Sequence, residues 1–268
     1  MSGRFKYDVD DAGVMVAAIN RPKQGNAFVI AMYSELAAAL QRAATDDKVK
    51  AVVVTGIGRF FSAGADVQEA SQSDGSPAAL ATMQNNFRTG PQVLAQALID
   101  FPKLTIAAVN GPVVGWPAAA LGLFDVVYVA SDATYRAPFL QLGLIPEACS
   151  SYTLPKTVGH AAAMDILLQG KVLNAEELVR LRIASRALPG GDGFHAAVLG
   201  EVRKQLKRNS LSSIVAAKAL TRGPDRAALT AANEREAEAM CKRFASGEPT
   251  QRFRAVFEQL AAMKKAKL

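Results

Sequence analysis

The sequence predicts an α/β fold followed by a helical C-terminal region, and three features of the chain indicate it. Short apolar runs rich in β-branched residues have the length and composition of buried strands. These runs are residues 14–19, 51–55, 104–109 and 126–130. Between the first two runs, Val29, Met32, Leu36 and Leu40 recur at helical spacing. From about Val158 onward the apolar periodicity is helical almost throughout.

This second part is expected to consist of helices with one short strand among them. Helical periodicity covers residues 162–168, 175–181, 194–206, 214–220, 231–244 and 253–263. A brief strand is expected around Ala187. Because no linker rich in Pro, Gly or Ser separates the parts, we predict an α/β core over residues 1–200 and a helical region over residues 201–268. Residues 71–77 are the most loop-like stretch.

Composition excludes several classes of protein. The chain has 268 residues and is 50% hydrophobic, enough for a sizeable core. Cys149 and Cys241 cannot form a disulfide framework, and the two histidines have no metal-ligand spacing, so no metal site is expected. The apolar stretch 104–130 is broken by polar residues, glycines and prolines, so it is not a membrane span. Residues 1–7 lack the apolar segment of a signal peptide, which predicts a protein that stays inside the cell.

Neither nucleic acid nor a nucleotide cofactor is expected as a partner. The net charge is +7, and much of the excess lies in the basic runs 203–208 and 264–267. Neither run has interleaved aromatic residues, which favours solvated helix faces over a nucleic-acid site. Gly56 and Gly58 form a fragment of a dinucleotide-binding motif, but Phe61 stands where the third glycine belongs. A nucleotide cofactor bound through that motif is therefore not predicted.

A loop over residues 58–66 follows a predicted strand and leads into a predicted helix. Its small residues Ala63, Gly64 and Ala65 let the backbone approach a ligand closely and leave amide groups free to donate hydrogen bonds. Taken alone, the segment also fits a plain strand-to-helix turn in which Asp66 caps the helix, and we expect Asp66 to be a cap rather than a base.

A second loop over residues 109–117 also ends a strand and opens an apolar helix, with Pro117 in the first turn. The amide of Trp116, just before that proline, would point away from the start of the helix. Two backbone amides from two such turns, converging on one oxygen, form an oxyanion hole. On a thioester substrate the stabilised charge is an enolate on the carbonyl oxygen.

These loops are part of a longer set of motifs. The motifs are Asn20-Arg21-Pro22 with Asn26-Ala27, Phe61-Ser62-Ala63-Gly64-Ala65-Asp66, Asn110-Gly111-Pro112-Val113-Val114-Gly115 and Phe124-Asp125. In this order and spacing the chain resembles the crotonase (enoyl-CoA hydratase/isomerase) superfamily over nearly its whole length. The resemblance implies a spiral core of ββα turns and a C-terminal helical region that builds homotrimers or dimers of trimers. It also implies acyl-coenzyme A thioester substrates, with no cofactor besides the coenzyme A of the substrate.

The resemblance assigns roles to residues of both loops. Ala65 and Trp116 would supply the oxyanion-hole amides, and Ala63 would lie near the adenine end of the ligand. Gly64 and Asp66 are further candidates for substrate contact. The superfamily usually has a small residue where this chain has Trp116, so the indole must point away from the thioester if its amide is to serve.

Two acids that hydratases of this superfamily use are absent from the chain. Their positions hold Ala119 and Phe139, so no carboxylate there can activate water and hydratase activity is not expected. Phe139 is instead a candidate for substrate contact, although the sequence leaves open that it packs in the core.

Glu147 is the acidic residue in the most suggestive place. Its apolar flanks would raise the pKa of a buried carboxylate toward working pH, whereas local sequence fits equally well a first-turn glutamate of a helix after Pro146. Its Pro-Glu-x-Cys-Ser-Ser setting resembles the peroxisomal 3,2-trans-enoyl-CoA isomerases, which implies that Glu147 is a single base that moves a double bond in fatty acid β-oxidation. Ala148 stands where that motif commonly has glycine, and Cys149 is expected to be a buried structural thiol.

Two other functions stay open. One is a non-catalytic acyl-CoA-binding scaffold, and the other is a different enolate reaction of a thioester, such as decarboxylation or hydrolysis. The tripeptide Ala266-Lys267-Leu268 resembles a peroxisomal import signal. We therefore expect a peroxisome or related organelle if the source is eukaryotic, and the cytoplasm otherwise.

Overall fold

The computed structural model describes residues 3–265 and is built around a mostly parallel sheet. The strands lie in the order β1-β2-β3-β4-β6-β9, and only β1 at the edge is antiparallel to its neighbour. Their bounds are β1 Phe5–Val9, β2 Val14–Ile19, β3 Ala51–Gly56, β4 Leu104–Val109, β6 Val126–Ala130 and β9 Arg186–Leu188. Every residue of β3 and β4 is buried, as expected of central parallel strands covered on both faces.

A second, smaller sheet accompanies the first. It consists of β5 Val113–Val114, β7 Thr134–Arg136 and β8 Leu173–Asn174. β5 follows β4 along the chain and β7 follows β6, and β5 and β7 pair in parallel. Two successive turns of the chain therefore each place one strand in each sheet, which is the ββα arrangement of the predicted superhelix. The mixed α/β fold class with C-terminal helices is confirmed.

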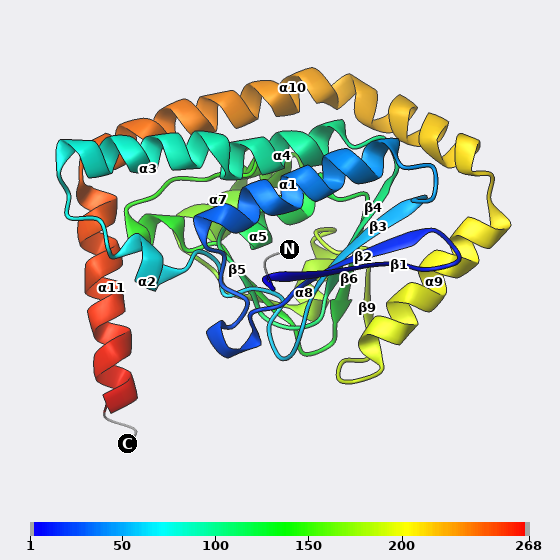
Figure 1. Cartoon of the computed structure of the whole chain (residues 1–268), viewed down its shortest axis with the longest axis horizontal. Coiled ribbons are helices and arrows are strands. Elements are labelled where there is room, and N and C mark those ends of the chain that lie inside the picture. The colour runs from blue at the N-terminus through cyan, green and yellow to red at the C-terminus, as the bar shows by residue number, and fades with distance from the viewer. Residues whose placement is uncertain (1–2, 266–268) are drawn as a thin grey trace.

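Helices cover the sheets and extend past them at the C-terminus. The first half contains α1 Ile30–Thr45, α2 Val67–Ala70, α3 Pro77–Thr89, α4 Pro91–Asp100 and α5 Trp116–Ala119. The second half contains α6 Ser150–Val158, α7 His160–Leu168, α8 Ala175–Arg180, α9 Phe194–Arg208, α10 Leu211–Ala245 and α11 Glu248–Lys265. Short 3-10 helices are η1 Pro22–Gln24, η2 Ala120–Leu123 and η3 Phe139–Leu142. The long α10 runs beside α3 and α4, and α11 descends from its end past α2 (Figure 1).

The predicted strands are confirmed, but the helical part differs from the prediction. It contains a second short strand, β8, besides the one expected around Ala187. The helices expected at 214–220 and 231–244 are a single helix, α10, which continues through Pro224. A proline inside a helix removes one hydrogen bond and leaves the carbonyl four residues earlier unpaired. That carbonyl belongs to Leu220, which is 78% exposed, so water can satisfy it. The predicted boundary at residue 200 falls inside α9, and the division into two regions stays a prediction.

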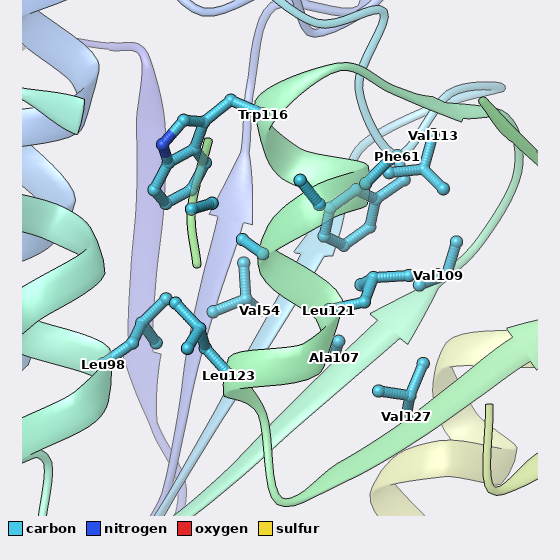
Figure 2. Close-up of a cluster of buried hydrophobic side chains, with 14 of the residues drawn as sticks. Val54, Phe61, Leu98, Ala107, Val109, Val113, Trp116, Leu121, Leu123 and Val127 are labelled. Carbon is cyan, nitrogen blue, oxygen red and sulfur yellow. The ribbon is translucent and has the colours of Figure 1, made fainter. Parts of the chain in front are cut away.

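The core between the sheet and its helices is close-packed and apolar (Figure 2). Val54 of β3 and Ala107 of β4 contribute from the sheet, and Leu98 of α4 contributes from the facing helix. The side chains of Trp116 and Leu123, from α5 and η2, fill the space between them. The start of α5 is therefore fixed by the main core.

No helix within residues 3–265 is both long and apolar enough to cross a membrane. The tripeptide proposed as an import signal, residues 266–268, lies outside the described residues.

Candidate active site

The two loops singled out in the sequence lie side by side in parallel. The amide of Ser62 donates to the carbonyl of Pro112 at 3.2 Å, and the amide of Val114 donates to the carbonyl of Ser62 at 2.9 Å. These bonds pair Ser62 with Val113 in a parallel bridge. Two residues further along each loop, Gly64 and Gly115 lie in contact, and Ala65 and Trp116 are the residues that follow them. These hydrogen bonds fix the alignment of two turns that are far apart in sequence.

Each candidate amide follows a glycine in an unusual backbone conformation. Gly64 has φ +91° and Gly115 has φ +69°, values that side-chain-bearing residues rarely adopt. No backbone hydrogen bond in the described part of the chain uses the amide of Ala65 as donor. Trp116 is the first residue of α5, so its amide has no partner within the helix. The site thus presents two neighbouring N–H groups without an acceptor among the described residues.

The side chain of Trp116 points into the core (Figure 2). It is 4% exposed, and its ring meets the ring of Tyr33 edge-on with centroids 5.3 Å apart. Trp116 is not among the described residues that line the neighbouring cavity, whereas Tyr33 is. The indole therefore points away from the cavity and does not narrow it directly.

A cavity of about 460 Å³ opens beside Ala65. Its wall is mostly apolar and is assembled from α1, α2, α3 and the two C-terminal helices. The apolar lining residues are Phe28, Ile30, Tyr33, Ala65, Ala70, Ala79, Met83, Phe87, Pro91, Leu144, Phe244 and Phe253. Carboxylates at Asp66, Glu69 and Glu147 also line it. The cavity combines a large apolar volume with a few polar groups, as ligand sites do.

Glu147 is buried in the wall of this cavity. The residue is 7% exposed, and its carboxylate has no hydrogen-bond or ion-pair partner within the described residues. Burial raises its pKa from the usual 4.5 to about 8, and the nearby negative charge of Glu236 contributes in the same direction. Burial likewise raises the pKa of Tyr33, which stays neutral. A carboxyl group whose pKa lies near neutral pH, in the wall of a mostly apolar cavity, has the properties of a general base.

The other two carboxylates of the cavity are engaged. Asp66 caps α2, as expected, because its Oδ1 accepts hydrogen bonds from the amides of Gln68 at 3.1 Å and Glu69 at 3.3 Å. Its Oδ2 forms an ion pair with Arg21 at 2.9 Å. Glu69 is exposed, and it accepts a hydrogen bond from the amide of Ile30 at 2.8 Å. Glu147 therefore differs from both in having an unengaged carboxylate.

The remaining candidate residues lie around the site without forming its wall. Ala63 is exposed and Gly64 is buried at the bend of the first loop, and neither lines the cavity in the described structure. Phe139 is 2% exposed and packs in the core, the second of the two possibilities that the sequence left open. Ala119 is equally buried. The positions at which hydratases carry glutamates hold apolar side chains in the folded chain.

Much of the cavity wall comes from residues that no sequence motif marks. Met83 and Phe87 come from α3, and Phe244 and Phe253 come from α10 and α11. The helical region was predicted, but no local pattern indicates which of its apolar residues face a cavity instead of the core. Tyr33 directly follows Met32 of the predicted apolar helix face. Its hydroxyl group was the feature that could have indicated a side chain facing a cavity.

The chain belongs to the enoyl-CoA hydratase/isomerase family, whose members match it over residues 10–260. Enoyl-CoA delta isomerase 2 of Rattus norvegicus is 36% identical over 241 residues, which are 89% of this chain and 59% of that protein. The chain thus spans about three fifths of that relative's length. Relatives named as hydratases also match: 2,3-dehydroadipyl-CoA hydratase of Escherichia coli is 33% identical over 83% of this chain and 84% of that protein.

Solved structures agree with the fold. The Pseudomonas aeruginosa protein OdaA superposes with a TM-score of 0.85 and 29% identity, covering 95% of this chain and 99% of that one. The family and the fold are therefore established for this chain, and the relatives that match it include proteins named as isomerases and proteins named as hydratases.

Proposed function

We propose that this chain is a Δ3,Δ2-enoyl-CoA isomerase that uses Glu147 as its single base. The observation that carries the proposal is the unengaged carboxylate of Glu147 in the same cavity wall as Ala65. The similarity to enoyl-CoA delta isomerase 2 supports the same reaction. The apolar residues at Ala119 and Phe139 argue against hydration, because no carboxylate at those positions can activate water.

In this mechanism the thioester carbonyl oxygen accepts hydrogen bonds from the amides of Ala65 and Trp116. Glu147 removes a proton from C2 of the 3-enoyl group, and the electron pair moves through the conjugated system to give a dienolate. Charge that develops on the oxygen is stabilised by the two amides. Glu147, now protonated, returns the proton at C4, and the double bond lies between C2 and C3. The carboxylate is regenerated, so no second acid is needed.

The test is isomerisation of 3-hexenoyl-CoA to 2-hexenoyl-CoA, followed by the absorbance of the conjugated thioester. Loss of a general base lowers the rate by roughly 10²–10⁴-fold, and we expect Glu147→Gln to do so. Glu201→Gln, at an exposed glutamate of α9 paired with Arg186, is the matched control and should keep the native rate. If Glu147→Gln retains full activity while Glu69→Gln loses it, the base is Glu69 and our assignment is wrong.

The same assay separates the other functions. Binding of acyl-CoA without turnover would indicate a scaffold, consumption of 2-hexenoyl-CoA a hydratase, and release of free coenzyme A a hydrolase. The homotrimer or dimer of trimers stays a prediction that light scattering checks.

A further inference from the structure

Glu236 lies on α10 with its carboxylate against the start of α6. It is 5% exposed, and its Oε2 accepts a hydrogen bond from the amide of Cys149 at 2.7 Å. Its Oε1 accepts another from the amide of Ser151 at 2.9 Å. Both donors follow Glu147 within four residues, so Glu236 binds the turn that carries Glu147.

This turn has a backbone that needs external support. Ala148 and Cys149 are consecutive non-glycine residues in the left-handed region, with φ of 55° and 61°. Such residues persist there only when surrounding structure holds them. Besides Glu236, α10 supplies the carbonyl of Leu229, which accepts a hydrogen bond from the Cys149 thiol at 3.4 Å. The contacts from α10 fix the chain immediately after Glu147.

Glu236 itself does not reach the cavity. It is not among the described lining residues, and both carboxylate oxygens accept amide hydrogens. We propose that Glu236 is a positioning residue for Glu147: by binding the amides of Cys149 and Ser151, it fixes the turn that directs the Glu147 carboxylate into the cavity. This inference rests on the proposed function, in which Glu147 is the base.

The charge of Glu236 has a second consequence. Burial raises its pKa, while the hydrogen bonds from Ser151 and Cys149 favour the ionised form. Two amides donating to the two oxygens fit a carboxylate better than a carboxylic acid. As an anion near Glu147, it disfavours ionisation of the base.

Other groups near this pair come from three helices. Arg222 and Arg235 of α10 oppose the negative charge around Cys149 and Glu236, respectively. Tyr33 of α1 and Glu69 of α2 lie on the cavity side. Glu236 thus affects Glu147 in two ways, through the position of the turn and through its negative charge, and substitutions of Glu236 can separate the two effects.

Glu236→Gln removes the charge and places the NH₂ donor of a carboxamide against one of the two donating backbone amides. We expect kcat to fall about 10-fold or more with KM within about 3-fold, and the acid limb of the pH–rate profile to move to lower pH. Glu236→Asp keeps the charge but is one methylene shorter, so kcat should fall while the acid limb stays in place. Glu234→Gln, at an exposed glutamate two residues away on α10, is the matched control and should change neither.

A folded Glu236→Gln variant with native kcat and an unmoved acid limb would overturn the proposal. If that variant does not fold, native kcat in Glu236→Asp would overturn it instead. Titration of ¹³C-labelled glutamate by NMR, with Glu147 assigned through Glu147→Gln, gives a readout without turnover. A changed ¹³C shift of the Glu147 carboxyl group in Glu236→Asp, which keeps the charge, supports the inference even if the native protein does not isomerise 3-hexenoyl-CoA, and an unchanged shift counts against it.

Discussion

Gly115 lies directly against Gly64: a β-carbon built on Gly115 would stand 3.6 Å from the Cα of Gly64. A β-carbon on Gly64 would stand 3.1 Å from the carbonyl oxygen of Val114. The two loops meet where neither residue has a side chain, and the two candidate oxyanion-hole amides belong to the residues that follow. The close approach therefore sets the separation of those amides.

Substituting either glycine should disturb the oxyanion hole. Gly64→Ala and Gly115→Ala each force a side chain into a left-handed conformation, which costs about 1–3 kcal/mol of stability. Displacement of one amide should lower kcat/KM about 10²-fold, measured with 3-hexenoyl-CoA.

Gly200→Ala is the control for these two variants. Gly200 lies inside α9 with open space around it, so alanine should be neutral or stabilising and leave the rate unchanged. Native kcat/KM in a folded Gly64→Ala protein would contradict the role of the Ala65 amide.

The rate of isomerisation should depend on pH through Glu147. The base must be ionised, and burial and Glu236 raise its pKa to about 8. We expect kcat/KM to increase with pH, with a midpoint near that value, when measured from pH 5 to 9.5. If kcat/KM does not change with pH below pH 8, ionisation of Glu147 in the free enzyme does not limit the rate, and the prediction is wrong.

Ionisation of Glu147 should also affect stability, but in the opposite direction: it activates the base and destabilises the folded protein. Between pH 4.5 and about 8, folded Glu147 holds a proton that the unfolded chain releases. The folded state binds more protons, so the free energy of unfolding falls as pH rises through this window. Glu147→Gln cannot ionise, and it should be more stable than the native protein at pH 9 by about 1–4 kcal/mol. Urea unfolding at pH 5 and pH 9 checks this, and equal differences at both pH values would contradict it.

The sequence was sufficient for the parts of the site that are local. Strands followed by loops of small residues mark the Ala65 and Trp116 turns. The apolar flanks of Glu147 fitted a buried acid and a first-turn glutamate equally well, and the family resemblance favoured the acid. The cavity wall and Glu236 were not predictable, because they depend on how α10 and α11 pack. Glu236 binds an amide 87 residues earlier in the chain, and a charged residue on a long helix is usually solvated. The sequence of the turn that follows Glu147 does not indicate that a residue of α10 binds its amides.

A partly buried ion pair between Asp125 and Lys218 attaches α10 to the sheet. Lys218 Nζ lies 2.7 Å from Asp125 Oδ2, and side-chain exposures are 10% and 16%. The same Asp125 oxygen accepts hydrogen bonds from the amide and hydroxyl of Thr105 in β4. The Phe124-Asp125 motif therefore has a structural role in the position of α10.

Asp125→Ala should destabilise the protein by about 2–4 kcal/mol, because the partly buried Lys218 ammonium loses its carboxylate partner and keeps only the carbonyl of Lys103. Burial already lowers the pKa of Lys218, and without Asp125 that pKa should fall further. Asp100→Ala removes an exposed pair between α4 and Arg226 of the same long helix, and it should cost less than about 1 kcal/mol. Urea unfolding of both variants at pH 7 measures the difference. Similar losses in the two would mean that the partly buried pair does not attach α10, and that Glu236 depends on other contacts for its place beside the Glu147 turn.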